Sequence, residues 1–78
     1  MKKLIITVEY GNASQTTALE FGFLEEATLP DYLERLGQAL FLTGAALRSA
    51  KVISSDCGIE WFASSDLVEE LNGPRLKN

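Results

Sequence analysis

Residues 2–10 read Lys-Lys-Leu-Ile-Ile-Thr-Val-Glu-Tyr, and this stretch decides the fold. Its side chains alternate, with Leu4, Ile6, Val8 and Tyr10 on one side and Lys3, Ile5, Thr7 and Glu9 on the other. A period of two places successive side chains on opposite faces of an extended chain. The stretch therefore predicts a β-strand with one strongly apolar face.

A second strand is expected directly after it. Residues 11–14 are Gly-Asn-Ala-Ser, which are turn formers, and residues 16–24 then alternate again. This second alternation places Leu19, Phe21 and Phe23 on one side. The two runs are predicted to pair as a hairpin.

The chain next shows the start of a helix. Thr28 can accept backbone N–H groups, Pro30 is tolerated in a first helical turn, and Asp31 would lie near the positive end of the helix dipole. A leucine stripe follows at helical spacing, at Leu29, Leu33, Leu36, Leu40 and Leu47. We predict one helix over residues 30–49, about 30 Å long, with Thr43-Gly44 as an alternative kink or early stop.

Two short β-prone runs, at residues 51–55 and 59–63, predict a second hairpin. Asp56-Cys57-Gly58 between them suits a three-residue loop with Gly58 in the left-handed conformation. Ser65 and Asp66 can then cap a short helix, which Asn72-Gly73-Pro74 would stop.

The resulting order, ββαββ with a small terminal helix, predicts the α+β class. We expect an antiparallel sheet of about four strands with one long helix packed on one face. A chain of 78 residues fits one domain, which we place at residues 1–73, with residues 74–78 as a frayed tail.

Charge and cysteine content exclude several classes of protein. With 7 Lys plus Arg against 11 Asp plus Glu, the net charge of −4 repels phosphate backbones, so direct nucleic-acid binding is not expected.

The expected location follows from the first apolar run and from the cysteine content. Glu9 ends that run too early for an export signal. Like charges never exceed two in a row, so no membrane contact is expected. Cys57 is the only cysteine, which suits a reducing compartment. We expect a cytoplasmic protein.

The residues needed for most enzyme chemistry are missing from the sequence. The chain has no histidine, which removes the commonest general base and the commonest transition-metal ligand. Its six glycines form no phosphate-binding loop, and no calcium-loop spacing occurs. We therefore expect no enzymatic activity, no catalytic residue, no cofactor and no metal.

Both faces of the predicted sheet carry apolar groups, whereas one helix can cover only one of them. The helix side is expected to hold Leu4, Ile6, Val8, Leu19, Phe21, Phe23, Ile59 and Trp61. Ile5, Thr7, Ala18 and Phe62 would then lie on the far side. The terminal helix, with Leu67, Val68 and Leu71, could cover that side internally, and otherwise it is open to a partner.

Two further features of the predicted helix could contact a partner. Leu42 falls on the face that points away from the leucine stripe. Acidic residues gather near the helix start, at Glu25, Glu26, Asp31 and Glu34. A solvated helix start with a favourable dipole explains the same acidic residues without a partner.

These observations favour a non-enzymatic protein-protein interaction or regulatory protein with a protein partner. The predicted partner-binding residues are Ile5, Phe62, Leu42, Glu25, Glu26, Asp31 and Glu34. A narrower hypothesis is a small acidic inhibitor of phage or mobile-element type, anti-defence or anti-CRISPR-like, that blocks a basic surface of a larger complex. The alternative is a structural or assembly subunit that acts as a homo-oligomer, and a homodimer would use the same surfaces.

Overall fold

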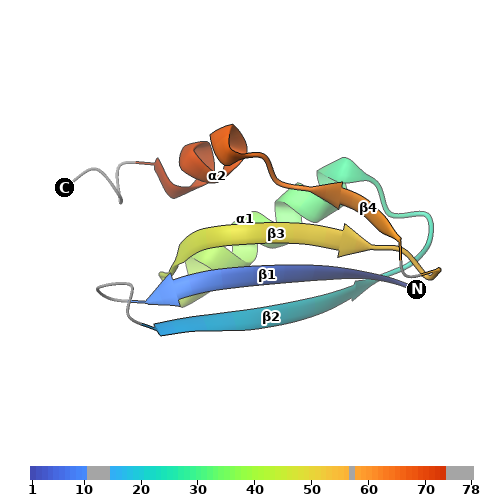
Figure 1. Cartoon of the computed structure of the whole chain (residues 1–78), viewed down its shortest axis with the longest axis horizontal. Helices are drawn as coiled ribbons and strands as arrows, with labels where there is room; N and C mark the ends of the chain where they lie inside the picture. The colour runs from blue at the N-terminus through green and yellow to red at the C-terminus, as the bar shows by residue number, and fades with distance from the viewer. Residues whose placement is uncertain (11–14, 57, 74–78) are drawn as a thin grey trace.

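The computed structural model of the protein describes residues 1–10, 15–56 and 58–73 (Figure 1). Its elements are β1 (Lys2–Tyr10), β2 (Gln15–Phe23), α1 (Leu29–Thr43), β3 (Ala46–Ile53), β4 (Ile59–Phe62) and α2 (Ser65–Asn72). The strands form one antiparallel sheet in the order β2-β1-β3-β4, and α1 lies across one face. The predicted α+β class is confirmed. The predicted turn at residues 11–14, Cys57 and the predicted tail at residues 74–78 lie outside the described residues.

β1 is an inner strand of the sheet and supplies the centre of the core. It pairs with β2 over nine residues without a register shift, and with β3 on its other side. Leu4, Ile6 and Val8 are completely buried, as their alternation predicts. Burial of such side chains contributes roughly 1.5–3 kcal/mol each.

α1 ends at Thr43, so the prediction of a helix that continues to residue 49 is wrong. Gly44 has a φ of 67°, in the left-handed region, and its N–H donates to the Leu40 carbonyl at 2.9 Å. Glycine adopts this conformation at low cost and commonly ends helices. The early stop considered at Thr43-Gly44 is the observed outcome, and Leu47 packs into the core from β3.

The core lies between α1 and the sheet. α1 buries Tyr32, Leu36, Ala39 and Leu40, and β3 buries Leu47, Ala50 and Val52. Of the predicted leucine stripe, Leu36 and Leu40 are buried, whereas Leu29 at the first turn is exposed. The helix therefore packs through the middle and end of its apolar stripe.

The loop between β3 and β4 does not use a left-handed Gly58. Among the described residues, the glycines with positive φ are Gly44 and Gly73. Instead, Ser54 N–H donates to the Gly58 carbonyl at 2.8 Å, and the Asp56 carboxylate accepts from the Gly58 N–H and the Ser54 hydroxyl. Local side-chain hydrogen bonds of this kind stabilise a turn without a special backbone conformation.

α2 lies along the edge of β3, beyond the end of the short β4 (Figure 1). The buried side chain of Asn72 binds the backbone of Leu47 twice: Oδ1 accepts from the N–H at 2.7 Å and Nδ2 donates to the carbonyl at 3.0 Å. Val68 and Leu71 pack against the core. The alternative in which α2 covers the far face is therefore wrong, and neither described helix covers that face.

Alanine at two glycines of this region should have opposite effects on stability. Gly37 lies within α1, where an added Cβ meets nothing within 4 Å, so Gly37→Ala should raise the free energy of unfolding by about 0.5–1 kcal/mol. Gly44→Ala should lower it by about 1–2 kcal/mol, because its φ is left-handed. Urea unfolding measures both changes, and shifts of the same sign would contradict the assigned helix end.

Asn72→Ala should lower the free energy of unfolding by about 2–4 kcal/mol, although alanine is the better helix former. The substitution leaves the buried N–H and carbonyl of Leu47 without their side-chain partner. Glu70→Ala, at an exposed position of α2, is the matched control and should change the value by less than about 0.5 kcal/mol. Equal effects in urea unfolding would exclude this role of Asn72.

Candidate protein-binding surfaces

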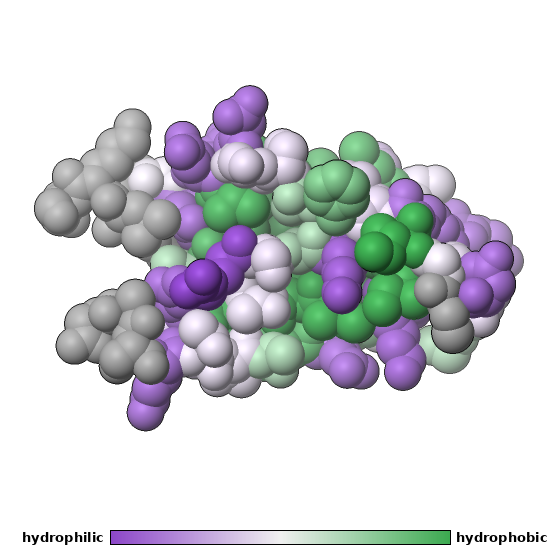
Figure 2. All heavy atoms as spheres, viewed as in Figure 1, coloured by the Kyte–Doolittle hydropathy of each residue, from purple (hydrophilic) through white to green (hydrophobic). Residues whose placement is uncertain are grey.

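An exposed apolar patch lies on the face of the sheet that is turned away from α1. Antiparallel pairing sets Lys51 between Ile5 and Phe62, and it sets Ile53 opposite Ile59. Directly opposed side chains share a face, and Ile5 alternates with the buried residues of β1. We call Ile5, Ile53, Ile59 and Phe62 the sheet-face patch. Figure 2 shows hydrophobic side chains gathered at the right-hand end of the sheet in that view. Ile59 and Phe62 are 63% and 68% exposed, whereas Ile5 and Ile53 are half-buried.

A β-bulge in β4 explains why this patch is larger than predicted. The β3–β4 register shifts between Val52 and Ile53, so that Val52 opposes Trp61 whereas Ile53 opposes Ile59. The prediction that Ile59 faces the helix is therefore wrong. The strand pairing places Ile5, Thr7, Ala18 and Phe62 on the far face, as predicted.

Two shallow depressions flank Ile5 on this face. One is lined by Thr7, Lys51 and Phe62, and the other by Met1, Lys3 and Ile53. The Lys3 Nζ lies 4.0 Å from Glu20, whereas Lys51 has no ion-pair partner within residues 1–10, 15–56 and 58–73. The patch therefore combines apolar hollows with an unpaired cation, Lys51, between its apolar side chains.

Leu42 is 80% exposed, but the structure does not bring it to the sheet-face patch. It lies at the end of α1, which packs on the opposite face of the sheet (Figure 1). Its neighbour Phe41 is also 80% exposed and was missed by the sequence analysis. The run Ala39-Leu40-Phe41-Leu42 contained the signal, because one face of a helix cannot bury four successive side chains.

The acidic cluster divides into two pairs with different surroundings. The Asp31 carboxylate accepts from the Thr28 N–H at 2.8 Å and so caps α1, and Glu25 lies 2.7 Å from the amino group of Met1. Glu26 and Glu34 are exposed and have no hydrogen-bond or ion-pair partner within the described part of the chain. These two carboxylates remain available to a partner.

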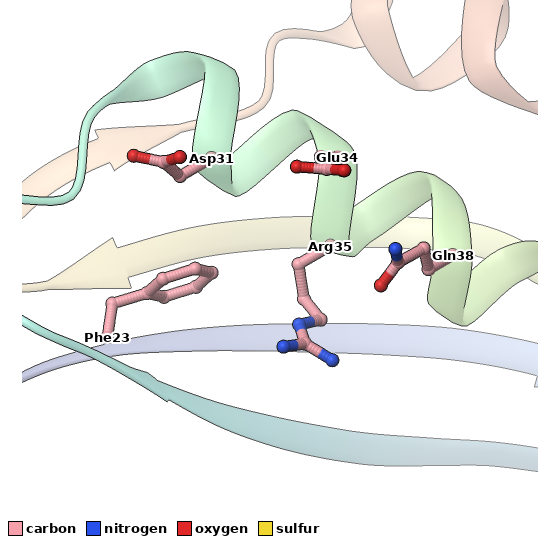
Figure 3. A pocket seen from close by; sticks show the side chains of 5 residues that line it. All are labelled: Phe23, Asp31, Glu34, Arg35 and Gln38. Atoms are coloured by element: carbon pink, nitrogen blue, oxygen red, sulfur yellow. The ribbon is translucent and has the colours of Figure 1, made fainter.

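A groove runs between β2 and α1 (Figure 3). Phe23 lines it from β2, and Asp31, Glu34, Arg35 and Gln38 line it from α1. The Arg35 guanidinium lies 5.3 Å from the centre of the Phe21 ring. An adjoining depression shares Phe23 and Asp31 and adds Gly22, Leu24, Glu26 and Ala27. We call these two hollows together the β2–α1 groove; sequence reasoning did not find it.

A polar cluster at the edge of the core joins β1, α1 and β4, with Lys2 and Tyr32 buried and Glu60 exposed. Lys2 is only 7% exposed, and its Nζ donates to the Ala27 carbonyl, to Tyr32 Oη and to Glu60 Oε2 at 2.8, 2.9 and 3.1 Å. Tyr32 Oη also donates to Glu60 Oε2 at 2.6 Å. Hydrogen bonds from Tyr32 and Lys2 hold the pKa of Glu60 below its ordinary value, and the bond to Tyr32 raises the pKa of Lys2. The cluster is internally satisfied and is a structural feature.

Comparisons with protein-family models, with curated protein sequences and with solved structures found no match. In the described ranges, no three acidic or cysteine side chains lie close enough together to hold a metal ion. Neither α1 nor α2 has the length and apolar character needed to cross a membrane. Function is therefore inferred from the surfaces of the molecule itself.

Acidification should destabilise the protein through Glu60. Because the pKa of Glu60 is lowered by folding, its contribution is complete above the ordinary glutamate pKa of about 4.3. That contribution is lost as the pH falls through the lowered pKa. Between pH 7 and pH 3, Glu60→Gln should therefore lose less free energy of unfolding in urea than the unsubstituted protein.

The control for this pH effect is Glu69→Gln, at an exposed position of α2. It removes the same charge outside the cluster and should show the same acid sensitivity as the unsubstituted protein. An acid sensitivity of Glu60→Gln equal to that of the control would contradict the role of Glu60.

Proposed function

We propose that the protein is a non-enzymatic binding protein that docks its sheet-face patch onto another protein. The observation that carries the proposal is that Ile5, Ile53, Ile59 and Phe62 lie on one face without a described element over them. Removal of apolar surface from water is the main driving force of association. Single exposed apolar residues are ordinary, whereas a contiguous group on one face is typical of an interaction site.

The composition of the patch defines the kind of partner surface that fits it. Phe62 is a large, exposed aromatic side chain at one side, a type that often dominates binding energy. The depressions on either side of Ile5 suit apolar side chains of the partner. A carboxylate of the partner would pair with Lys51, which lies between Ile5 and Phe62 and would otherwise be covered without an ion-pair partner.

The inhibitor hypothesis is a second form of the binding function, and it uses exposed carboxylates on the α1 side of the sheet. In that form the protein blocks a basic surface of a larger complex, as an anti-defence protein of a phage or mobile element would. Glu26 and Glu34 support it, because both are exposed and lack a partner among the described residues. Attraction between such exposed charges weakens as salt is added, so strong salt dependence of complex formation distinguishes this form.

Phe62→Asp should reduce the amount of partner captured from a lysate of the source organism by at least about tenfold, because it places a charge in the apolar patch. Leu42→Asp is the matched control: it makes the same chemical change at an exposed apolar residue outside the patch and should retain capture. Both variants should keep the free energy of unfolding within about 0.5 kcal/mol.

Three outcomes would reject the proposal. Capture that survives Phe62→Asp would exclude the patch, and capture lost only with Leu42→Asp would move the interface to α1. Self-association of the purified protein in sedimentation equilibrium, abolished by Phe62→Asp, would favour the homo-oligomeric subunit instead.

A further inference from the structure

We propose that the outer edge of β2 and the β2–α1 groove bind an extended, basic segment of another polypeptide, which adds to the sheet as a further strand. This site is separate from the sheet-face patch, because the groove lies on the face of the sheet that α1 covers and the patch lies on the opposite face. The proposal therefore stands independently of the sheet-face patch, and it shares Glu26 and Glu34 with the inhibitor hypothesis.

The two edges of the sheet differ in how far their backbone groups are paired. At the β3–β4 edge, β4 is short, the Ala63 N–H continues the pairing to Ala50, and Asn72 binds the backbone of Leu47. At the other edge, no described strand or helix pairs with the outer side of β2. An unpaired edge offers a row of N–H and carbonyl groups to another chain.

β2 lacks the features that usually prevent such pairing. It is nine residues long and pairs with β1 in a continuous register without a bulge. It contains no proline and no lysine, and Glu20 is its single charge. Long, regular and weakly charged edges are favoured templates for strand addition.

The groove beside this edge would receive the side chains of an added strand. Leu19, Phe21 and Phe23 are half-buried and face the α1 side of the sheet. Alternate side chains of an added strand would point to the same side and contact this apolar floor. Residues of α1, among them Glu34 and Gln38, form the opposite wall (Figure 3).

The charges of the groove define the chemistry of the segment. Three carboxylates line it, from Glu26, Asp31 and Glu34, against the single cation of Arg35. Arg35 itself lies over the Phe21 ring, so the aromatic floor of the groove already accommodates one cation. At the Phe23 end, the lining residues include no cation, so a lysine or arginine of the incoming segment fits there.

The same charges disfavour a second copy of the protein at this edge. A two-fold axis through paired β2 strands would bring two acidic walls to the same side of the joined sheet. Each copy also carries a net charge of −4, so the pair would repel at long range. A basic partner segment would be attracted by the same acidic side chains that make two copies of the protein repel each other.

The test uses the intact protein and a blocked heptapeptide that alternates lysine and valine, followed by amide NMR. Saturable shifts should appear in β2 and in the first turns of α1, and amide exchange in β2 should slow, because the outer N–H groups become bonded. A heptapeptide that alternates glutamate and valine should not bind. Phe62→Asp should bind the lysine peptide with unchanged affinity, which separates this site from the sheet-face patch.

Paired charge variants test the groove itself. Glu26→Gln with Glu34→Gln should weaken binding of the lysine peptide by about fivefold or more. Glu69→Gln with Glu70→Gln removes the same net charge from exposed positions of α2 and should weaken it by less than about twofold.

Four results would overturn the proposal: no saturable shift up to millimolar peptide, equal weakening by both double variants, shifts confined to the sheet-face patch, or a β2-centred dimer that forms without peptide. The last result would assign the edge to a second copy of the chain.

Discussion

A four-stranded sheet has two faces and two edges, and the described helices of this chain cover one of each. α1 packs on one face, and α2 closes the edge beside β3. The other face keeps the sheet-face patch, and the other edge keeps the unpaired side of β2. Because apolar groups and backbone polar groups both gain from being covered, this incomplete coverage accounts for the surfaces on which protein binding is proposed.

The β-bulge of β4 affects both faces of the sheet. The register shift at Ile53 sends Ile59 to the open face, and Glu60, the residue between Ile59 and Trp61, bonds Lys2 and Tyr32 in the polar cluster. Lys2 is satisfied there by a carbonyl, a hydroxyl and a carboxylate, which lets a lysine occupy a nearly buried position. One extra residue in a strand thus enlarges the apolar patch and supplies the carboxylate that pairs with the buried Lys2.

Local patterns in the sequence were sufficient for the fold class and for part of the open sheet face, but not for the full set of exposed surfaces. The alternation of β1 and β2 and the cap at residues 28–31 predicted those elements, because strand and helix periods depend on neighbouring residues. Arg48 falls within the helix predicted over residues 30–49, yet it lies in β3 and pairs with Glu9 of β1. Strand register, the bulge at Glu60 and the β2–α1 groove depend on contacts between distant segments, which no local pattern encodes.

The strand order also has a consequence for how the chain can assemble. β1 is synthesised first but needs neighbours on both sides, and β3 reaches it only after β2 and α1 have been made. Lys3 pairs with Ile53, so this ladder joins positions 50 residues apart, whereas the β1–β2 hairpin is local. Closing the longer loop carries the larger entropic cost. A nascent chain can therefore form the hairpin early, with the apolar side of β1 exposed until α1 and β3 emerge from the ribosome.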